Sequence, residues 1–270
     1  MRRIGPNDCL EAKGNHKLVM LTAYDYPTAR IIDRTGMVDI ILVGDSLGMV
    51  VQGKPNTLEV TMEQMLYHSS LVSRATSRSM VVGDMPFMSY HTTVEEAVRN
   101  AGRFVQEGGV NAVKLEGAGI VTDKIKAIIE AGIPVMGHLG LTPQSINRFG
   151  GWKLQGKTKD EAKRIINDAK ALEKAGVFSI VLEMVPAELA GEITKQVSVP
   201  TIGIGAGPHC DGQVLVLHDI IGLTEFSPSF AKQYVNVSKA IEDAVSQFAS
   251  EVKKGIYPNA KHSFTLEEKE

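Results

Sequence analysis

The segment DIILVGD, residues 39–45, is a run of apolar residues that closes on a carboxylate, Asp45. Three later runs have the same form and end at Asp84, Glu116 and Glu183. Continuous apolar runs of this length are typical of parallel strands that are buried on both faces. A charged side chain is costly to bury in a core, so we expect each carboxylate where its strand leaves the sheet.

Other apolar runs continue this pattern along the chain, and helical patterns separate them. The segment KDEAKRIINDAKALEKAG (159–176) predicts an amphipathic helix that ends at Gly176, and Thr61 with Gln64 forms a capping-box pattern. The run 213–222 fits a helix or a strand equally well. The predicted strands are residues 18–24, 39–45, 79–87, 111–117, 134–140, 178–185, 199–207 and 230–237.

Eight strands alternating with helices within 270 residues predict an α/β fold, specifically a (β/α)8 TIM barrel. We expect a single domain over residues 1–270, with a polar C-terminal tail from about residue 256. A doubly wound open sheet is the alternative, but its glycine-rich fingerprint should follow the first strand. The loop there, TAYDYPT (22–28), contains no glycine.

Composition excludes several classes of protein. The formal net charge is -2, which gives no basic footprint for nucleic acid. The two cysteines, Cys9 and Cys210, form neither a disulfide scaffold nor a CxxC zinc motif. We see no signal-peptide pattern at the N-terminus and no apolar run near the roughly 18 residues that span a bilayer. We therefore expect a cytoplasmic protein with no membrane or nucleic-acid partner.

Polar residues gather at the predicted strand ends, which in a barrel open into one shared cup. Four carboxylates in one cup repel each other unless a cation or a proton relieves them, and Mg²⁺ prefers oxygen ligands. The sequence therefore predicts a magnesium-dependent enzyme that binds an anionic substrate. The strand-end residues are Asp45 and Ser46 (strand two), Asp84 (three), Lys114 and Glu116 (four), His138 (five) and Glu183 (six).

Most of these residues also have an ordinary structural explanation, and Glu183, which follows an apolar run, is the hardest to explain in that way. Asp45 or Asp84 alone can cap a helix or a turn, Lys114 can pair with Glu116, and His138 can be structural. What favours a functional site is that five strands end in polar residues together, since buried charge is costly. The glycine-rich segment GIGAG (203–207) is either an anion-binding loop or a place of close packing.

With these residues in place, the chain resembles the ketopantoate hydroxymethyltransferase family. The similar segments run in order over most of the sequence. They are TAYDYPTA (22–29), LVGDSLGMVVQG (42–53), DMPFMSY (84–90), VKLEG (113–117), GHLGLTPQS (137–145), FGGWKLQGKT (149–158), LEMVP (182–186), IGIGAG (202–207) and DGQVLVLHD (211–219).

The resemblance implies transfer of a one-carbon unit from 5,10-methylenetetrahydrofolate to 3-methyl-2-oxobutanoate, giving 2-dehydropantoate for pantothenate synthesis. It also implies a homo-oligomer, commonly a decamer. By resemblance, Asp45 and Asp84 hold Mg²⁺ with Glu116 near the ion, and Glu183 is our candidate for the catalytic base. The implied substrate-binding residues are Asp45, Ser46, Asp84, Lys114 and His138.

Two other functions stay open at this level. A magnesium-dependent carbon–carbon lyase or phosphonomutase-like enzyme would share the metal carboxylates, but it would usually need a reactive cysteine or a phosphate clamp nearby. A non-catalytic anion-binding barrel built around residues 203–207 would bind its ligand without metal, and it leaves the four carboxylates unexplained.

Overall fold

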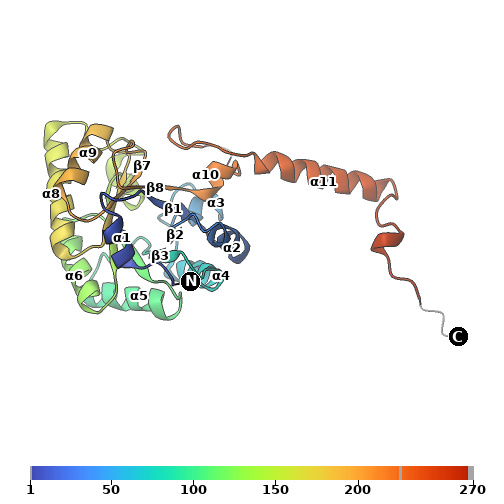
Figure 1. Cartoon of the computed structure of the whole chain (residues 1–270), viewed down its shortest axis with the longest axis horizontal. Coiled ribbons are helices and arrows are strands. Elements are labelled where there is room, and N and C mark those ends of the chain that lie inside the picture. The colour runs from blue at the N-terminus through green and yellow to red at the C-terminus, as the bar shows by residue number, and fades with distance from the viewer. Residues whose placement is uncertain (1, 225–226, 267–270) are drawn as a thin grey trace. The chain divides into compact units, whose positions relative to one another are not determined.

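The structure is a computed structural model that describes residues 2–224 and 227–266. The chain divides into two compact units, residues 1–217 and 218–270. The first unit contains the whole barrel, and the second contains the C-terminal helix (Figure 1).

Eight parallel strands form a closed barrel in which each strand pairs with the next and β8 pairs with β1 (Figure 1). The predicted (β/α)8 architecture is therefore confirmed. The strands are β1 (Leu18–Thr22), β2 (Ile40–Val43), β3 (Met80–Asp84), β4 (Ala112–Glu116), β5 (Val135–Gly140), β6 (Ser179–Glu183), β7 (Thr201–Ile204) and β8 (Gly212–Leu215).

Helices follow the strands and surround the barrel (Figure 1). The α-helices of the first unit are α1 (Pro6–Ala12), α2 (Tyr26–Arg34), α3 (Leu47–Val50), α4 (Met62–Ala75), α5 (Val94–Gln106), α6 (Thr122–Glu130), α7 (Ile146–Phe149), α8 (Lys159–Ala175) and α9 (Ala187–Gln196). Two predicted helix boundaries are confirmed. Thr61 and Gln64 form the reciprocal capping box of α4, and Gly176 ends α8 in the left-handed conformation with φ of 96°.

The prediction of strand eight at residues 230–237 is wrong. The eighth strand is β8, Gly212–Leu215, which overlaps the start of the run 213–222 that fitted a helix or a strand equally well. It is only four residues long, and its apolar run continues directly into the helix Leu217–Ile221, so the pattern alone does not separate strand from helix there. Gly212 is needed because a Cβ at this position would lie 2.6 Å from the carbonyl oxygen of Leu18 on β1.

The hydrophobic core fills the barrel interior with inward-facing residues from the eight strands, among them Met20, Met80 and Met136. Helix α1 adds Cys9 and Ala12 to this core, both fully buried. The apolar core and the polar strand-end residues therefore occupy different parts of the barrel, which leaves the carboxyl ends of the strands for chemistry.

The second unit consists mainly of α11 (Val237–Lys253), after the short α10 (Leu217–Ile221) that begins at the last residue of the first unit. Helix α11 has four apolar residues at helical spacing, Ile241, Val245, Phe248 and Val252, and all four are exposed.

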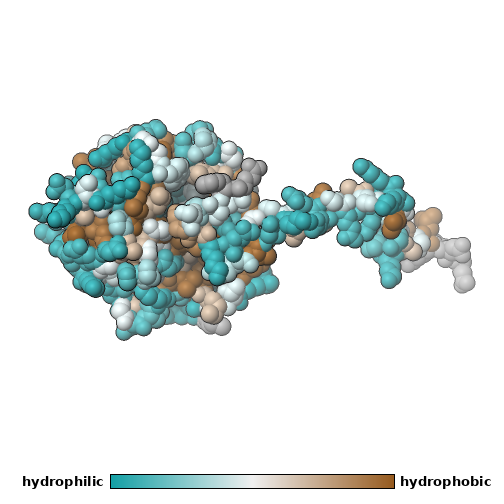
Figure 2. Space-filling view, turned by 90° about the horizontal axis from the view of Figure 1, so that it is seen from above, coloured by the Kyte–Doolittle hydropathy of each residue, from teal (hydrophilic) through white to brown (hydrophobic). Residues whose placement is uncertain are grey.

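In Figure 2, the face toward the viewer is mostly hydrophilic, with hydrophobic residues in separate patches.

The predicted polar tail begins in this unit at about residue 256. Residues 260–262 form one turn of 3₁₀ helix, and residues 267–270 of the tail lie outside the described part. Every helix among residues 2–224 and 227–266 is too short or too polar to cross a lipid bilayer.

Candidate active site

The structure brings six of the seven predicted site residues together at the carboxyl ends of β2 to β6. Five of these side chains are buried, and Glu183 retains 14% exposure. The half-buried Ser46 follows Asp45 directly, and its hydroxyl hydrogen-bonds to the Tyr24 hydroxyl at 2.8 Å. The five buried residues are Asp45, Asp84, Lys114, Glu116 and His138. We call them, together with Glu183, the carboxylate cluster.

Asp84 and Lys114 face each other because they are register partners on β3 and β4. The Lys114 ammonium donates to both Asp84 carboxylate oxygens at 2.7 Å, and it lies 3.8 Å from Oε1 of Glu116. Burial alone would lower the pKa of Lys114, but the surrounding acids raise that pKa above its usual value. Lys114 is therefore a permanent cation within the cluster.

His138 lies between two carboxylates. It is the register partner of Glu116, whose Oε1 is 3.3 Å from His138 Nδ1, and His138 Nε2 is 3.2 Å from Oε2 of Glu183. Both contacts are less well aligned than ideal hydrogen bonds. Burial and Lys114 lower the pKa of His138, but Glu116 and Glu183 raise it to about 9. The imidazole is therefore positively charged at neutral pH.

Asp45 has the most unfavourable position for a charge. Its backbone N–H donates to Oδ2 of Asp84 at 3.3 Å, so the two aspartates are neighbours. Burial raises the pKa of Asp45 well above its usual value, and Asp84 and Glu116 raise it further. Burial also raises the pKa of Asp84, and Lys114 offsets this only in part. The two aspartates therefore favour either a bound proton or a bound cation.

The donor set fits a divalent cation. When ionised, the four carboxylates of the cluster face two positive groups, Lys114 and His138, so two negative charges are left without a counter-charge. Within the described residues, no three His, Cys, Asp or Glu side chains are spaced as a ready metal-binding set. Asp45 and Asp84 are the adjacent pair that would hold the ion, with Glu116 near it. This suits Mg²⁺, which often binds one or two carboxylates and completes its coordination with water and substrate oxygens.

Glu183 is placed by an unusual local backbone at the end of β6. Met184, the next residue, has a φ of 44°, which is rare for a residue with a side chain. Its N–H still donates to Ile204 on β7. On the other side, Gly140 approaches so closely that a Cβ there would lie 2.2 Å from the Glu183 carbonyl oxygen. This packing fixes Glu183 at the mouth of the cluster.

The sequence analysis missed two residues that bind the cluster. Gln144, in a 3₁₀ turn after β5, donates from Nε2 to Oδ2 of Asp45 at 2.9 Å. Tyr90, after β3, donates its hydroxyl to Oε1 of Gln144 at 2.7 Å. The available signal was position alone, since both residues lie in loops that leave the carboxyl ends of strands.

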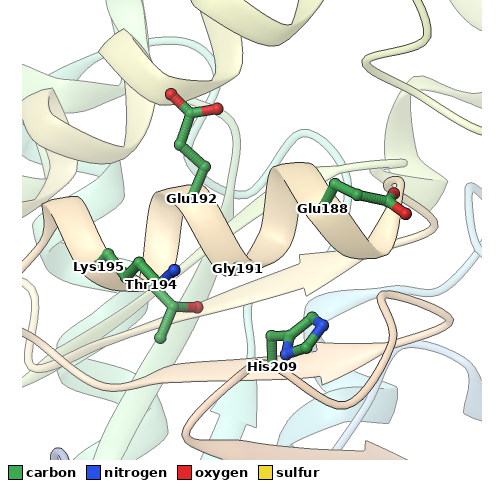
Figure 3. A pocket seen from close by; sticks show the side chains of 6 residues that line it. All are labelled: Glu188, Gly191, Glu192, Thr194, Lys195 and His209. Atoms are coloured by element: carbon green, nitrogen blue, oxygen red, sulfur yellow. The ribbon is translucent and has the colours of Figure 1, made fainter.

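A surface hollow of about 430 Å³ lies apart from the cluster (Figure 3). Residues of α9 line it together with His209, and Glu192 points away from His209. None of the lining residues belongs to the carboxylate cluster. In the nearby 203–207 segment, a Cβ on Gly207 would lie 2.4 Å from the Cβ of Ala187, so this glycine serves close packing. The hollow is not the predicted site.

Comparison with known proteins identifies close relatives. A sequence model described as ketopantoate hydroxymethyltransferase matches residues 5–260. Relatives called 3-methyl-2-oxobutanoate hydroxymethyltransferase include one from Thermoanaerobacter sp. (strain X514), 55% identical over 96% of this chain and 94% of its own. Another, from Pyrobaculum neutrophilum, is 59% identical over 93% of this chain and 95% of its own.

Solved structures share the fold at low sequence identity. A phosphoenolpyruvate phosphomutase from Streptomyces platensis subsp. rosaceus has a TM-score of 0.62 and 16% identity, covering 93% of this chain and 88% of its own. A phosphonopyruvate hydrolase in complex with oxalate and Mg²⁺ has a TM-score of 0.58 and 14% identity, covering 96% of this chain and 93% of its own. At this identity the likeness establishes the barrel fold alone.

Proposed function

Since the chain belongs to the ketopantoate hydroxymethyltransferase family, we propose that it takes the one-carbon unit for 3-methyl-2-oxobutanoate from 5,10-methylenetetrahydrofolate. Enzymes of this family transfer a hydroxymethyl group to 3-methyl-2-oxobutanoate in pantothenate synthesis, and this chain is one of them. The family match decides against the lyase and the non-catalytic barrel that the sequence left open. The products are 2-dehydropantoate and tetrahydrofolate, and one water is consumed.

The observation that supports the proposed mechanism is a difference in position within the cluster. Asp45 and Asp84 lie deep and adjacent, whereas Glu183 stands at the partly exposed mouth. Asp45 and Asp84 would hold Mg²⁺, with Glu116 nearby. An ion held there would supply positive charge that makes the C3 proton of the bound substrate more acidic.

Glu183 is the proposed general base that removes the C3 proton. A carboxylate can serve in this role when it lies within reach of the proton, and general-base catalysis typically contributes about 10²–10⁴-fold. The assignment is supported by the position of Glu183, whose Oε2 lies 3.2 Å from His138 Nε2 and therefore beside the cluster. Water adds to the methylene carbon of the folate and the carbon–nitrogen bonds break, which releases formaldehyde and tetrahydrofolate. The nucleophilic C3 then attacks the formaldehyde carbon, and the new alkoxide takes a proton back from Glu183.

Positive groups of the cluster are the proposed anchors for the anionic substrate. Lys114 and Ser46 would bind the substrate carboxylate, and His138 would bind an oxygen of the substrate or product. Both Lys114 and His138 are cations at neutral pH, which supports these roles. Asp45 and Asp84 are proposed to contact the substrate as well, because Asp84 pairs with Lys114 and Asp45 is the neighbour of Asp84.

We also propose a homo-oligomer, with ten copies by resemblance to the family. The exposed apolar stripe of α11 supports an assembly, because Ile241, Val245, Phe248 and Val252 form a continuous helical face. The proposed compartment is the cytoplasm, which agrees with the free and buried thiols of Cys9 and Cys210. Light scattering of the purified chain measures the number of copies.

Proton NMR of 3-methyl-2-oxobutanoate in deuterated water tests the reaction. With enzyme, Mg²⁺ and methylenetetrahydrofolate, the C3 proton signal should disappear while a hydroxymethyl resonance grows, and a chelator should abolish both changes. Loss of the C3 signal without product would keep the proton abstraction and overturn the folate donor. An unchanged spectrum from folded, metal-loaded enzyme would overturn the proposed mechanism.

A further inference from the structure

Two uncharged residues, Gln144 and Tyr90, join the acids on β2 and β4 into one hydrogen-bonded network. Gln144 donates from its side chain to Asp45 at 2.9 Å and from its backbone N–H to Oε2 of Glu116 at 3.0 Å. The backbone N–H of Glu116 in turn donates to the Tyr90 hydroxyl at 3.2 Å. One residue in the loop after β5 thus contacts two carboxylates from different strands.

The orientation of the Gln144 amide is fully determined by its partners. Its Oε1 accepts from the Tyr90 hydroxyl, and its Nε2 donates both to Asp45 and to the carbonyl oxygen of Met85 at 2.9 Å. A flipped amide would set Oε1 against the Met85 carbonyl oxygen, which can only accept a hydrogen bond. Tyr90 is fully buried and Gln144 is 5% exposed, so water cannot easily replace these bonds.

A neutral donor at this position has a specific consequence for Asp45. The amide fixes the carboxylate and occupies its Oδ2, but it adds no positive charge to the site. An arginine or lysine here would offset the negative charge that a cation is needed to balance. The network therefore orients the Asp45 carboxylate and leaves its negative charge to be balanced by a cation.

We propose that Gln144, held in orientation by Tyr90, is a positioning residue that keeps Oδ2 of Asp45 occupied and leaves Oδ1 to bind the divalent cation. Neither residue needs to touch substrate for this role. The inference rests on the proposed function, because it takes Asp45 as a metal ligand. Residues that orient metal ligands typically change metal affinity by about 10–100-fold when they are replaced.

The test is a binding titration of the purified full-length chain with Mn²⁺, followed by electron paramagnetic resonance without substrate. Gln144→Met keeps the length of the side chain but removes both amide donors, and the backbone bond to Glu116 stays available. Tyr90→Phe keeps the ring and removes only the hydroxyl. We expect the Mn²⁺ dissociation constant to rise about 10–100-fold in Gln144→Met and less in Tyr90→Phe.

Matched controls carry the same substitutions outside the site. Tyr67 is 63% exposed on α4, and Gln196 is exposed on α9, where it bonds to Glu192. Tyr67→Phe and Gln196→Met should bind Mn²⁺ as the unmutated chain does. A second readout is the Mg²⁺ dependence of the rate, since the turnover number of both site variants should recover as Mg²⁺ is raised.

The outcomes separate this inference from the proposed function. Weaker Mn²⁺ binding in folded site variants, with recovery at high Mg²⁺, supports the positioning role. Unchanged Mn²⁺ binding in a folded Gln144→Met variant overturns it, as does a lower melting temperature with the same dissociation constant. If the unmutated chain catalyses the transfer without any bound metal, the proposed metal mechanism itself fails.

Discussion

The Lys114 ammonium is equidistant from the two carboxylate oxygens of Asp84, at 2.7 Å from each. Both residues are almost fully buried, so this pair is shielded from water. The contact gives Asp84 a fixed counter-charge before any ligand binds. It also means that Lys114 and a divalent cation would both bind the Asp84 carboxylate. Removing Lys114 should therefore change the stability of the chain.

Replacing Lys114 with methionine should leave Asp84 buried without its partner. Breaking one side of a buried ion pair typically costs about 3–5 kcal/mol in free energy of unfolding. Urea unfolding measures this loss, and Mg²⁺ should restore part of the stability because it returns a cation to the site. The exposed Lys157 is a matched control, and Lys157→Met should change stability little. Equal unfolding midpoints for both variants would contradict the finding that Lys114 is a structural counter-ion.

Glu183→Gln should abolish most of the turnover while leaving metal binding intact. The amide keeps the size of the side chain but cannot accept the C3 proton, so we expect a fall of about 10²–10⁴-fold in turnover number. Calorimetric titration should give an unchanged Mg²⁺ affinity for this variant. Asp84→Ala should instead weaken Mg²⁺ binding. A near-normal rate in Glu183→Gln would remove Glu183 from the role of base.

Much of this site follows from the sequence because strand ends carry a simple signal. Asp84, Glu116 and Glu183 each close an apolar run, and in a parallel barrel such ends converge. Their meeting in one cluster was therefore predictable, whereas their individual chemical roles remain predictions. The barrel was predictable from the alternation of strands and helices, but its eighth strand is Gly212–Leu215 and not the predicted 230–237.

The sequence does not predict residues in segments that have no helical or strand-like hydrophobic pattern. Gln144 sits in a 3₁₀ turn, and its two acidic partners are 28 and 99 residues away along the chain. Helix α1 was missed because it buries only Cys9 and Ala12 within a polar segment. Such residues are identified by tertiary contacts, which a single sequence does not show.

Gly140→Ala should disturb the end of β6. Gly140 has a φ of 93°, and an added Cβ would lie 2.2 Å from the Glu183 carbonyl oxygen and 2.8 Å from Val185 Cγ1. Backbone strain of this kind costs about 1–3 kcal/mol, and the clash adds to it. We expect a lower free energy of unfolding and a lower turnover number, measured by denaturant unfolding and steady-state kinetics.

Gly102 offers the control for Gly140. It lies within α5, and an added Cβ there would meet no atom within 4 Å. Gly102→Ala should stabilise the chain by about 0.5–1 kcal/mol, because alanine is the better helix former. If Gly140→Ala and Gly102→Ala changed the free energy of unfolding equally, the close contact between Gly140 and the Glu183 carbonyl oxygen would be contradicted.

Asp33 makes the free energy of unfolding depend on pH in the acidic range. The Asp33 carboxylate accepts hydrogen bonds from the backbone N–H groups of Ser77 and Ser79 at 2.8 and 2.7 Å, just before β3. Burial alone would raise the pKa of Asp33, but these bonds and those from the serine hydroxyls lower it to about 2. Because the folded pKa lies below the unfolded value of 3.8, the ionised carboxylate stabilises the folded chain at higher pH.

This stabilisation should be fully present above the unfolded pKa of Asp33 and disappear as the pH falls through its folded value. A pKa shift of this size corresponds to about 2 kcal/mol. Asp33→Asn should therefore lower the free energy of unfolding by about that amount at pH 7, and the difference should shrink between about pH 4 and pH 2. Chemical unfolding of both proteins across this range measures it. A difference that stays constant down to pH 2 would show that Asp33 acts through shape rather than through its charge.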